Sequence, residues 1–417
     1  MQSAGPIGQF VARPGVLDLG WGHPLPALLP VDEWAVAGAE AARSFGWQAL
    51  AYGHATGPGP LLDWLGGHLR RIEGGGTAAG QTFVTAGASH ALSLVAAVLA
   101  EPGDVVLVDS PTYHLAFAIL ADRGVELVRA PADEDGVDPA ATGELIRSLR
   151  AAGRRVPMLY LVPTYANPTG RSLPGERRRA LVELAGREGL TVVEDDTYRE
   201  IAYEGAAPAS LWRLSGGEHV VRLGSFAKTV APGLRLGWIN AAPPIVRRLA
   251  GLGYVDSGGG VNHAAAVTMA VFGAGGAYDR HVARVRGHYR DQRDVLVAAL
   301  RERAPALSVP CPPGGWFLWL RLPAAMAAAR LLPVAERHGT SFVAGPRFYA
   351  DGRGGADLIR LSFSHLPPGD LDRAAGRLAA AIGECGGTGE GAPEGGAAPC
   401  VPSRAPTVDG WQAPPAI

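Results

Sequence analysis

The chain has 417 residues with a formal net charge of −1, and 47% of its residues are hydrophobic. A chain of this length can bury large cores and form two or three domains. The balanced charge argues against a basic surface for nucleic acid or membranes, and no apolar run is long enough to span a bilayer. Three cysteines (Cys311, Cys385 and Cys400) show neither metal-ligand spacing nor a disulfide framework. We therefore expect a cytoplasmic protein without a metal site.

The N-terminal part of the chain predicts a leader and then a short packed segment. Residues 1–15 have no apolar periodicity and are expected to be poorly structured. Residues 16–24 are predicted to be extended and residues 31–45 to be helical. A second helix over 61–72 follows a Gly- and Pro-rich loop at 52–59.

From residue 82 onward, short apolar runs alternate with segments long enough to be helices. The predicted strands cover 82–85, 105–109, 158–162, 191–194, 220–224 and 236–240. The predicted helices between them cover 89–100, 114–123, 144–152 and 174–188. Apolar strands separated by helices are typical of a mainly parallel sheet with helices on both faces, so we expect an α/β domain.

The last third predicts a smaller α+β domain. Its predicted helices are 262–272, 278–303 and 368–382, and its predicted strands are 311–323, 340–344 and 358–364. The Gly-, Pro- and Ala-rich end has no apolar periodicity and predicts a disordered tail. We expect an N-terminal segment that packs with the small domain, a large domain, a small C-terminal domain and the tail, at 1–45, 46–285, 286–384 and 385–417.

Lys228 is the only lysine in the chain, since the other 37 of the 38 lysine and arginine residues are arginine. Arginine replaces lysine well as a solvated charge, but its guanidinium stays protonated and cannot act as an amine nucleophile. A lysine kept at a single position is therefore a candidate for Schiff-base chemistry. The alternative is that one lysine has simply persisted in an arginine-rich composition, and its neighbours must decide between the two.

Chemically useful residues follow the predicted strands, at the edge where a parallel sheet binds ligands. Ala88 and Ser89 open a helix whose first N–H groups can hold a phosphate. The later strands are followed by Tyr113, by Asn167, by Asp195 and Tyr198, and by Ser225, Lys228 and Arg235. Singly, Asp195 could cap a helix, Asn167 could form a turn and Tyr113 could pack in a core. Together they supply an amine, a phosphate cradle, a stacking ring and a carboxylate, which pyridoxal 5′-phosphate (PLP) requires.

The motifs around these residues are YGHATG at Tyr52, TAGASHAL at Thr85, PTY at Pro111, NPTG at Asn167, EDDTY at Glu194, SFAKTVAPGLRLGW at Ser225 and IRLSFS at Ile359. In combination they resemble the fold-type I PLP-dependent enzymes, specifically the class I and II aminotransferases. The chain is similar to the branch that contains 2-aminoadipate and kynurenine aminotransferases and the effector domains of MocR-type regulators. The resemblance covers residues 16–382.

The resemblance implies a role for each residue. Lys228 would form the internal aldimine with PLP and carry the proton between the substrate Cα and the cofactor's C4′ carbon. Asp195 would pair with the pyridine nitrogen, and Tyr198 and Asn167 would hydrogen-bond the phenolic oxygen. Tyr113 would stack on the ring. The phosphate would be bound by Ala88, Ser89, Ser225 and Arg235.

Three further residues are assigned by the resemblance alone. Tyr52 would reach the phosphate of a neighbouring subunit, which implies a homodimer. Arg360 would bind the α-carboxylate of the substrate through both guanidinium nitrogens, with the backbone near Gly22 closing over it. A surface ion pair is the alternative for Arg360.

Some positions depart from the family pattern. The cradle has Ala88-Ser89 where Ser-Gln is usual, so one side-chain donor is missing. His90 and His114 are either pocket residues or local packing. Trp316 replaces a smaller or more flexible residue and could line the pocket with Trp21 or face the core. The glycine-rich stretch at 256–263 is expected to be an active-site loop.

These features leave three functions to weigh. The first is a PLP-dependent aminotransferase that moves an amino group from an α-amino acid to a 2-oxo acid. The second is other PLP chemistry on a specialised amino acid, by elimination, replacement, cyclisation or decarboxylation, because the same carbanion serves each. The third is a MocR-type regulator, which we do not expect because the matching region begins within about twenty residues of Met1.

Overall fold

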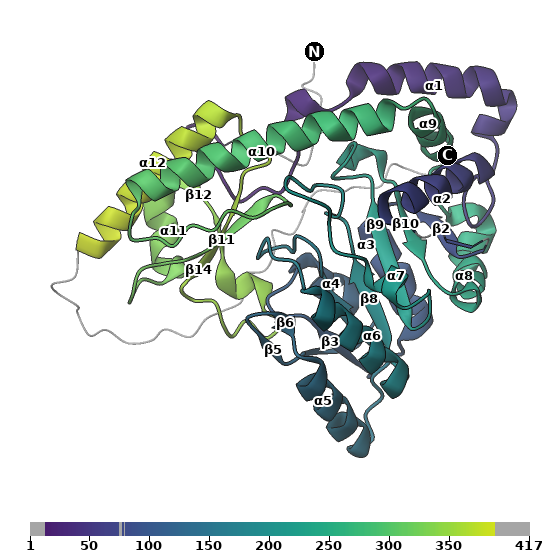
Figure 1. The fold of residues 1–417 in the computed structure, drawn as a ribbon, viewed down its shortest axis with the longest axis horizontal. Coiled ribbons are helices and arrows are strands. Elements are labelled where there is room, and N and C mark those ends of the chain that lie inside the picture. Colours follow the sequence, from purple (N-terminus) through teal and green to yellow (C-terminus); the bar gives the residue numbers. More distant parts are fainter. Residues whose placement is uncertain (1–12, 75–76, 79, 388–417) are drawn as a thin grey trace, which may run out of the picture.

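The computed structural model describes residues 13–74, 77–78 and 80–387. Its centre is a seven-stranded sheet in the order β2-β10-β9-β8-β7-β3-β4 (Figure 1). The strands are β2 (Thr82–Thr85), β3 (Val105–Val108), β4 (Glu126–Arg129), β7 (Met158–Leu161), β8 (Thr191–Asp195), β9 (Val220–Ser225) and β10 (Gly237–Asn240). β10 runs antiparallel to β2 and β9, and the other four pairings are parallel. The α/β fold predicted from the apolar runs is confirmed.

Helices cover both faces of this sheet because the side chains of its inner strands are almost all buried, on one face or the other. Val106 and Val108 of β3 pack in the core under α3 (Ala88–Leu99), α4 (Leu115–Ala121) and α8 (Pro243–Ala250). Val105 and Leu107 point to the opposite face. That face is covered by α5 (Pro139–Ala151), α6 (Gly175–Glu188) and α7 (Leu211–Leu214). Near β2 and β10, α2 (Gly59–Glu73) and α9 (His263–Ala274) close a further core.

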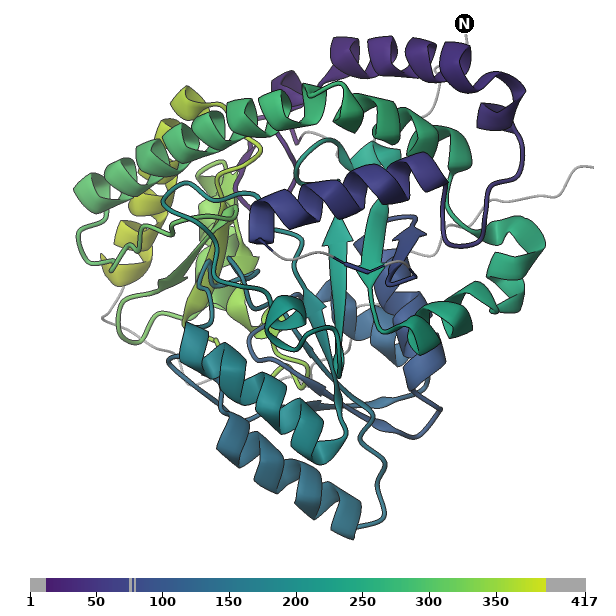
Figure 2. The same ribbon diagram turned by 45° about the vertical axis from the view of Figure 1, so that its right-hand side comes forward.

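A smaller sheet forms the second part of the molecule. β11 (Phe317–Arg321), β14 (Leu358–Ser362) and β13 (Val343–Ala344) pair antiparallel in the order β11-β14-β13. Its core includes side chains of α10 (Ala277–Arg303), α11 (Ala328–Arg337) and α12 (Pro368–Gly387). The long helix α10 runs along α12 at one end and reaches α9 at the other, so it ties the two parts together (Figures 1 and 2).

The N-terminal segment contacts both parts. β1 (Leu17–Asp18) pairs in parallel with β12 (Thr340–Ser341) of the small part, and Leu19 and Leu28 enter its core. The helix α1 (Val31–Phe45) instead packs on α9 of the large part. The domain boundaries expected from the sequence therefore stay a prediction. The expected leader up to residue 12 and the tail from residue 388 lie outside the described residues, and residues 385–387 still belong to α12.

Several elements differ from the sequence-based expectation. The strand expected over 311–323 is shorter, because Gly314 and Gly315 turn against Tyr165 before β11 begins. The edge strand β4 was missed since it has no continuous apolar run, and its side chains are exposed or partly buried. The short hairpin of β5 (Ala132–Asp133) and β6 (Gly136–Val137) and the helices α7 and α8 were also not predicted. Among the described residues, no helix is both long and apolar enough to cross a membrane.

Candidate active site

Lys228 lies in the turn that follows β9 and is partly buried. Its Nζ donates a hydrogen bond to the carbonyl oxygen of Gly22 at 3.1 Å. Burial of the amine, with the nearby charge of Arg360, lowers the pKa of Lys228 from 10.5 to about 8, although Asp195 opposes this shift. The ammonium form still predominates at pH 7, but the neutral amine, which a nucleophile or proton acceptor requires, is far more populated than in a lysine with the ordinary pKa.

Asp195 ends β8 and is 8% exposed. Its Oδ2 accepts a hydrogen bond from the Tyr160 hydroxyl at 2.9 Å, and its Oδ1 accepts one from the Thr197 hydroxyl at 2.6 Å. Burial raises the pKa of Asp195 even though these bonds favour the carboxylate. No arginine or lysine pairs with it within ion-pair distance in the described part of the chain. A cationic group bound beside it would relieve this desolvation.

Arg360 lies in the middle of β14 and is 4% exposed. Its guanidinium donates to Asn167 Oδ1 at 3.0 Å and to the carbonyl oxygen of Gly20 at 2.5 Å. The rings of Phe317 and Phe348 lie 4.3 Å and 5.1 Å from its Cζ. Burial lowers the pKa of Arg360 to about 10, and its Nε has no hydrogen-bond partner in the described residues. A buried guanidinium without a carboxylate partner is a ready site for an anion.

Two tyrosines lie beside these charges. Tyr198 is 5% exposed and its ring lies 5.8 Å from Lys228 Nζ. Burial raises the pKa of Tyr198 and raises that of Tyr113 to about 12. Both phenols are therefore neutral at physiological pH and can donate hydrogen bonds.

The start of α3 forms a concave corner with Arg235. Gly87 has φ +96°, and a Cβ at this position would lie 2.6 Å from a guanidinium nitrogen of Arg235. Arg235 donates to the carbonyl oxygen of Ala86 at 3.0 Å, and the first turn of α3, at Ala88 and Ser89, leaves N–H groups without intrahelical partners. This corner combines a helix N-terminus with a cation, which suits a phosphate.

Two more residues border this corner. The Ser225 hydroxyl accepts a hydrogen bond from the backbone N–H of Ala227 at 3.1 Å. His90 accepts one through Nδ1 from the N–H of Ala86 at 3.0 Å, while its Nε2 is buried without a partner in the described chain. His90 therefore shapes the turn before α3. His114 lies at the start of α4, with its ring 5.0 Å from that of Phe348.

Tyr52 lies away from this group of residues. It is 91% exposed and its ring lies against Gly258, where an added Cβ would be 2.9 Å from the ring. Gly258 belongs to a π-helical turn at Val255–Gly259, in the loop expected near the site. Trp47, Leu50 and Tyr254 are exposed by 77%, 85% and 60%. Such a collection of exposed apolar side chains is typical of a contact surface.

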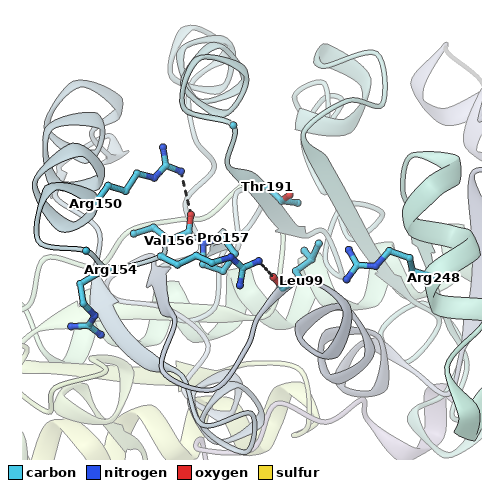
Figure 3. Close-up of a pocket in the computed structure, with 10 residues that line it drawn as sticks. Leu99, Arg150, Arg154, Val156, Pro157, Thr191 and Arg248 are labelled. Atoms are coloured by element: carbon cyan, nitrogen blue, oxygen red, sulfur yellow. Dashed lines mark hydrogen bonds between the residues drawn. The ribbon is translucent and has the colours of Figure 1, made fainter.

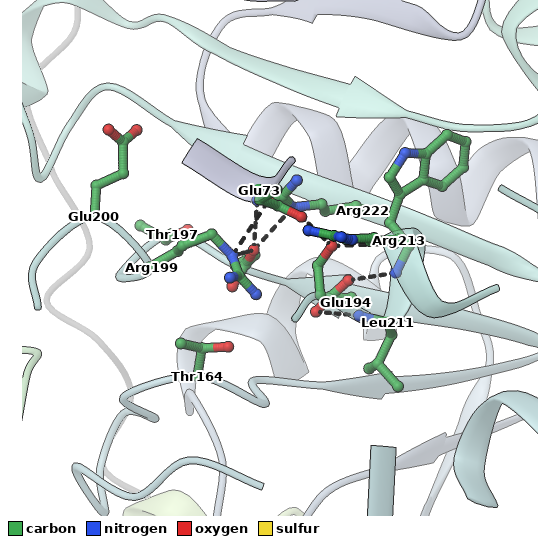
Figure 4. A network of polar contacts seen from close by, with 12 residues as sticks. Glu73, Thr164, Glu194, Thr197, Arg199, Glu200, Leu211, Arg213 and Arg222 are labelled. Atoms are coloured by element: carbon green, nitrogen blue, oxygen red, sulfur yellow. Dashed lines mark hydrogen bonds and ion pairs between the residues drawn. The ribbon is translucent and has the colours of Figure 1, made fainter. Parts of the chain in front are cut away.

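A buried charge network includes Glu73, Glu194, Arg199 and Arg222 (Figure 4). Since successive side chains of a strand point to opposite faces, it lies on the face of the sheet opposite to Asp195. Arg222 pairs with Asp196 at 2.7 Å and with Glu73, and Arg199 pairs with both carboxylates. Glu194 accepts hydrogen bonds from the first N–H groups of α7, at Leu211 and Trp212, both at 3.0 Å. The network ties α2, α7, β8 and β9 together just behind the predicted site.

A cavity of about 540 Å³ lies at the opposite end of the sheet (Figure 3). Its arginines hold helix ends rather than an open anion site. Arg155 donates to the carbonyl oxygen of Leu99 at 3.0 Å, Arg150 donates to that of Glu188 at 2.8 Å, and Arg248 donates to that of Val98. Cations at helix C-termini are stabilising there. The predicted residues gather instead at the carboxyl ends of β3, β7, β8 and β9.

Two contributors to the site, Gly20 and Tyr160, were not predicted. Gly20 supplies its carbonyl oxygen to Arg360. Gly22, whose backbone is expected to close over the substrate, supplies its carbonyl oxygen to Lys228, and a Cβ on Gly22 would lie 2.9 Å from the Phe317 ring. In the sequence, Tyr160 lies within an apolar run that predicts a buried strand. Its hydroxyl group was the one feature that could have indicated a polar partner such as Asp195. Trp316 belongs to the small-part core and also places its ring 4.6 Å from Lys228 Nζ. In the described ranges, no cluster of His, Cys, Asp and Glu could hold a metal ion.

Comparison with known proteins identifies the family of the chain. Residues 15–378 match the family described as aminotransferase class I and II. The chain is 31% identical to aromatic-amino-acid aminotransferase 1 of Thermococcus litoralis over 379 residues, 90% of each chain. It is 32% identical to the 2-aminoadipate transaminase of Thermus thermophilus over 383 residues, 90% of this chain and 92% of that one.

Among solved structures, the kynurenine aminotransferase of Pyrococcus horikoshii, in complex with PMP, aligns with a TM-score of 0.83 at 30% identity, covering 89% of this chain and 91% of that one. The residues present fit PLP, since a cradle for a phosphate, an amine and a buried carboxylate in need of a cation all lie at one edge of the sheet. The aminotransferase activity and PLP cofactor expected from the sequence are confirmed. The chain belongs to the class I and II aminotransferases, the PLP-dependent enzymes of fold type I.

Proposed function

We propose that Lys228, Asp195 and Arg360 carry the transfer of an amino group between an α-amino acid and a 2-oxo acid at this site. The observation that supports this most strongly is a pair of cations, Lys228 and Arg360. Both have lowered pKa values, and neither has a carboxylate within ion-pair distance in the described residues. An amino acid brings the missing anion, and its carboxylate would replace the Gly20 carbonyl on Arg360.

When bound, PLP acts as the electron sink for the Cα carbanion. The chain's residues would prepare that chemistry. Asp195 would hold the proton on the pyridine nitrogen, because an anion in this buried setting gains from a cationic partner. Tyr198 and Asn167 would donate to the phenolic oxygen, and Tyr113 would lie on the ring. Lys228, as the neutral amine, would take the proton from the substrate Cα and deliver it to the C4′ carbon of the cofactor.

The phosphate would be held by backbone and side-chain donors together. Ala88 and Ser89 offer the first N–H groups of α3, Ser225 offers its hydroxyl and Arg235 offers a charge-assisted bond. Gly22 would bind the substrate through its backbone. The guanidinium of Arg235 lies against Gly87 and donates to the carbonyl oxygen of Ala86. A phosphate bound in this corner would therefore contact Arg235 and fix its position.

We propose that the working form is a homodimer. Tyr52 is 91% exposed beside other exposed apolar residues, which a second copy of the chain would bury. In that assembly Tyr52 would reach the phosphate of the partner subunit. The cytoplasmic location and the domain boundaries given above are also retained as predictions.

The donor is proposed to have a large side chain. Aromatic rings surround Arg360, at Phe317 and Phe348, and the relatives named above are an aromatic-amino-acid aminotransferase, a 2-aminoadipate transaminase and a kynurenine aminotransferase. Aromatic amino acids and 2-aminoadipate are therefore the first donors to test.

The test is a half-reaction followed by absorbance. Adding a donor amino acid to the purified enzyme should convert the bound cofactor to its pyridoxamine form, and 2-oxoglutarate should reverse the change. Product analysis should find only a 2-oxo acid and the matching amino acid. No conversion across a broad panel of amino acids, or products of elimination or decarboxylation, would contradict the proposal.

A further inference from the structure

Trp316 is 0% exposed and is the largest of the fully buried side chains among the described residues. It packs in the core of the small part, yet the centre of its ring lies 4.6 Å from Nζ of Lys228, which belongs to the large part. The second ring near this ammonium, that of Tyr198, is farther away at 5.8 Å. Of these two rings, that of Trp316 is therefore the nearer to Lys228, the only lysine of the chain.

The ring is fixed by its surroundings. Tyr289 meets it edge-on at 5.2 Å between centroids and Tyr198 does so at 5.9 Å. The carbonyl oxygen of Trp316 accepts a hydrogen bond from the N–H of Phe363 at 3.1 Å. The preceding residue, Gly315, has φ +76°, and a Cβ there would lie 3.0 Å from the backbone of Tyr165. A ring held on both sides offers its face to Lys228 without further loss of side-chain freedom.

We propose that Trp316 is a positioning residue that stabilises the ammonium form of Lys228 whenever this amine is not bonded to the cofactor. The proposal rests on the role assigned to Lys228 above. A cation over an indole face is attracted by the ring quadrupole, and the attraction is strongest when the pair is withdrawn from water. Lys228 has to gain and lose one proton in each half-reaction, so a group that favours the charged form sets the pH at which that exchange is balanced.

Other charged and titratable groups act on the same amine and must be kept constant in a test. Arg360 and Arg235 disfavour the ammonium and Asp195 favours it. Burial lowers the pKa of His23 to about 4, so this imidazole is neutral when Lys228 titrates. Tyr198 is also neutral in this range, because burial raises its pKa. Against a net unfavourable set of charges, the ring of Trp316 joins the Gly22 carbonyl oxygen and Asp195 in opposing the loss of the proton.

Because the chain has one lysine, its amine can be observed directly. The holoenzyme would be prepared in the pyridoxamine-phosphate form, where Lys228 is free, from protein labelled with carbon-13 at the lysine Cε. A single resonance is expected, and its shift with pH reports the pKa of Lys228. In Trp316→Met, which fills space without a ring, the pKa should decrease by about 1 unit. In Trp316→Phe the decrease should be smaller, because Phe is a weaker partner than Trp.

Tyr289→Leu is the matched control. It removes a buried ring that touches Trp316, and no contact between Tyr289 and Lys228 is present in the described structure. In this variant the pKa of Lys228 should stay within about 0.3 unit of its value in the parent enzyme. An unchanged or raised pKa in both Trp316 variants, or an equal decrease in Tyr289→Leu, would overturn the proposal.

The titration needs no turnover, which separates the two proposals. If the half-reaction proceeds but the titration gives no difference, the role of Trp316 is wrong while that of Lys228 stands. If the pyridoxamine form cannot be reached with any amino acid, the proposed function is wrong; the same titration can then be made after adding pyridoxamine phosphate directly. Should Trp316→Met not fold, the comparison of Trp316→Phe with the parent keeps the test, since only a π contact predicts a decrease between two rings.

Discussion

Asp195 and Asp196 are neighbours in the chain, but they face opposite sides of the sheet and behave oppositely. Asp195 meets neutral hydroxyl groups, those of Tyr160 and Thr197, and burial raises its pKa. Asp196 is as deeply buried, and burial opposes its ionisation too. However, Arg199 and Arg222 lie against it and hold its pKa below the usual value.

The difference follows from the period of a strand, which sends successive side chains to opposite faces. One face at the end of β8 leaves the carboxylate of Asp195 without a cation, and the other pairs the carboxylate of Asp196 with two arginines. A buried charge left unpaired costs stability unless a ligand completes it. We therefore expect the face with Asp195 to carry function and the face with Asp196 to carry stability.

Within this comparison of the two faces, the largest expected effect is on activity, from Asp195→Asn. The amide keeps the shape and the hydrogen bond from Tyr160 but loses the charge that would hold a cationic ring nitrogen. The turnover number kcat should fall by about 10² to 10³-fold, while the melting temperature of the cofactor-free protein stays equal or rises. Steady-state kinetics and thermal unfolding measure the two. A variant that unfolds while keeping its activity would reverse the assignment of the two faces.

Asp196→Asn should give the opposite result. Removing this charge leaves Arg199 and Arg222 with too few buried carboxylates, and breaking a buried pair destabilises by about 3 to 5 kcal/mol. The free energy of unfolding in urea is the measurement. The protein that does fold should keep kcat within about 3-fold of the parent, because Asp196 does not face the cofactor site. A kcat loss as large as that of Asp195→Asn would erase the contrast.

The pH dependence of the stability lost in Asp196→Asn sharpens the same comparison. The folded pKa of Asp196 is lowered, so its stabilisation is present above the unfolded value of about 4 and is lost as the pH falls through the folded value. The difference in unfolding free energy between the parent and Asp196→Asn should therefore be full at pH 7 and shrink steadily below about pH 4. Denaturation curves across this range check it, and a difference that grows in acid would show that another group is responsible.

The smallest expected effect is that of Tyr160→Phe. Its hydroxyl donates one hydrogen bond to Asp195 at 2.9 Å, and such a bond contributes about 1 kcal/mol. The affinity for PLP should decrease by about 5-fold, measured by cofactor titration, with little change in stability. An effect as large as that of Asp195→Asn would mean that the tyrosine itself contacts the reacting atoms.

Much of this arrangement could be predicted from the sequence, because it is written in local patterns. Buried parallel strands are continuous apolar runs, and the site residues lie directly behind them, as Asp195 follows β8 and Lys228 follows β9. For Arg360, whose strand belongs to the other part of the molecule, the carboxylate-binding role comes from the resemblance of its motif to the family and stays a prediction.

What could not be predicted depends on contacts between distant parts of the chain. Nothing in the sequence pairs Glu73 with Arg222, and no local pattern tells that Gly20 and Gly22 offer carbonyl oxygens to two cations. The sequence allowed Trp316 either to face the core or to line the pocket. It does both, because it packs in the core of the small part while its ring also lies next to Lys228. The strand β4 has no continuous apolar run, and the helix α8 begins with two prolines. The sequence signals for both elements were therefore weak.

The most direct test concerns the single lysine. Reducing the holoenzyme with sodium borohydride makes the link between the amine and the cofactor permanent, and mass spectrometry of peptides then locates it. We predict one cofactor mass per chain, on the peptide that contains Lys228, and none in Lys228→Arg, whose kcat should be lower by at least about 10⁴-fold. A cofactor mass on any other amine, or appreciable turnover by Lys228→Arg, would contradict the role of this residue.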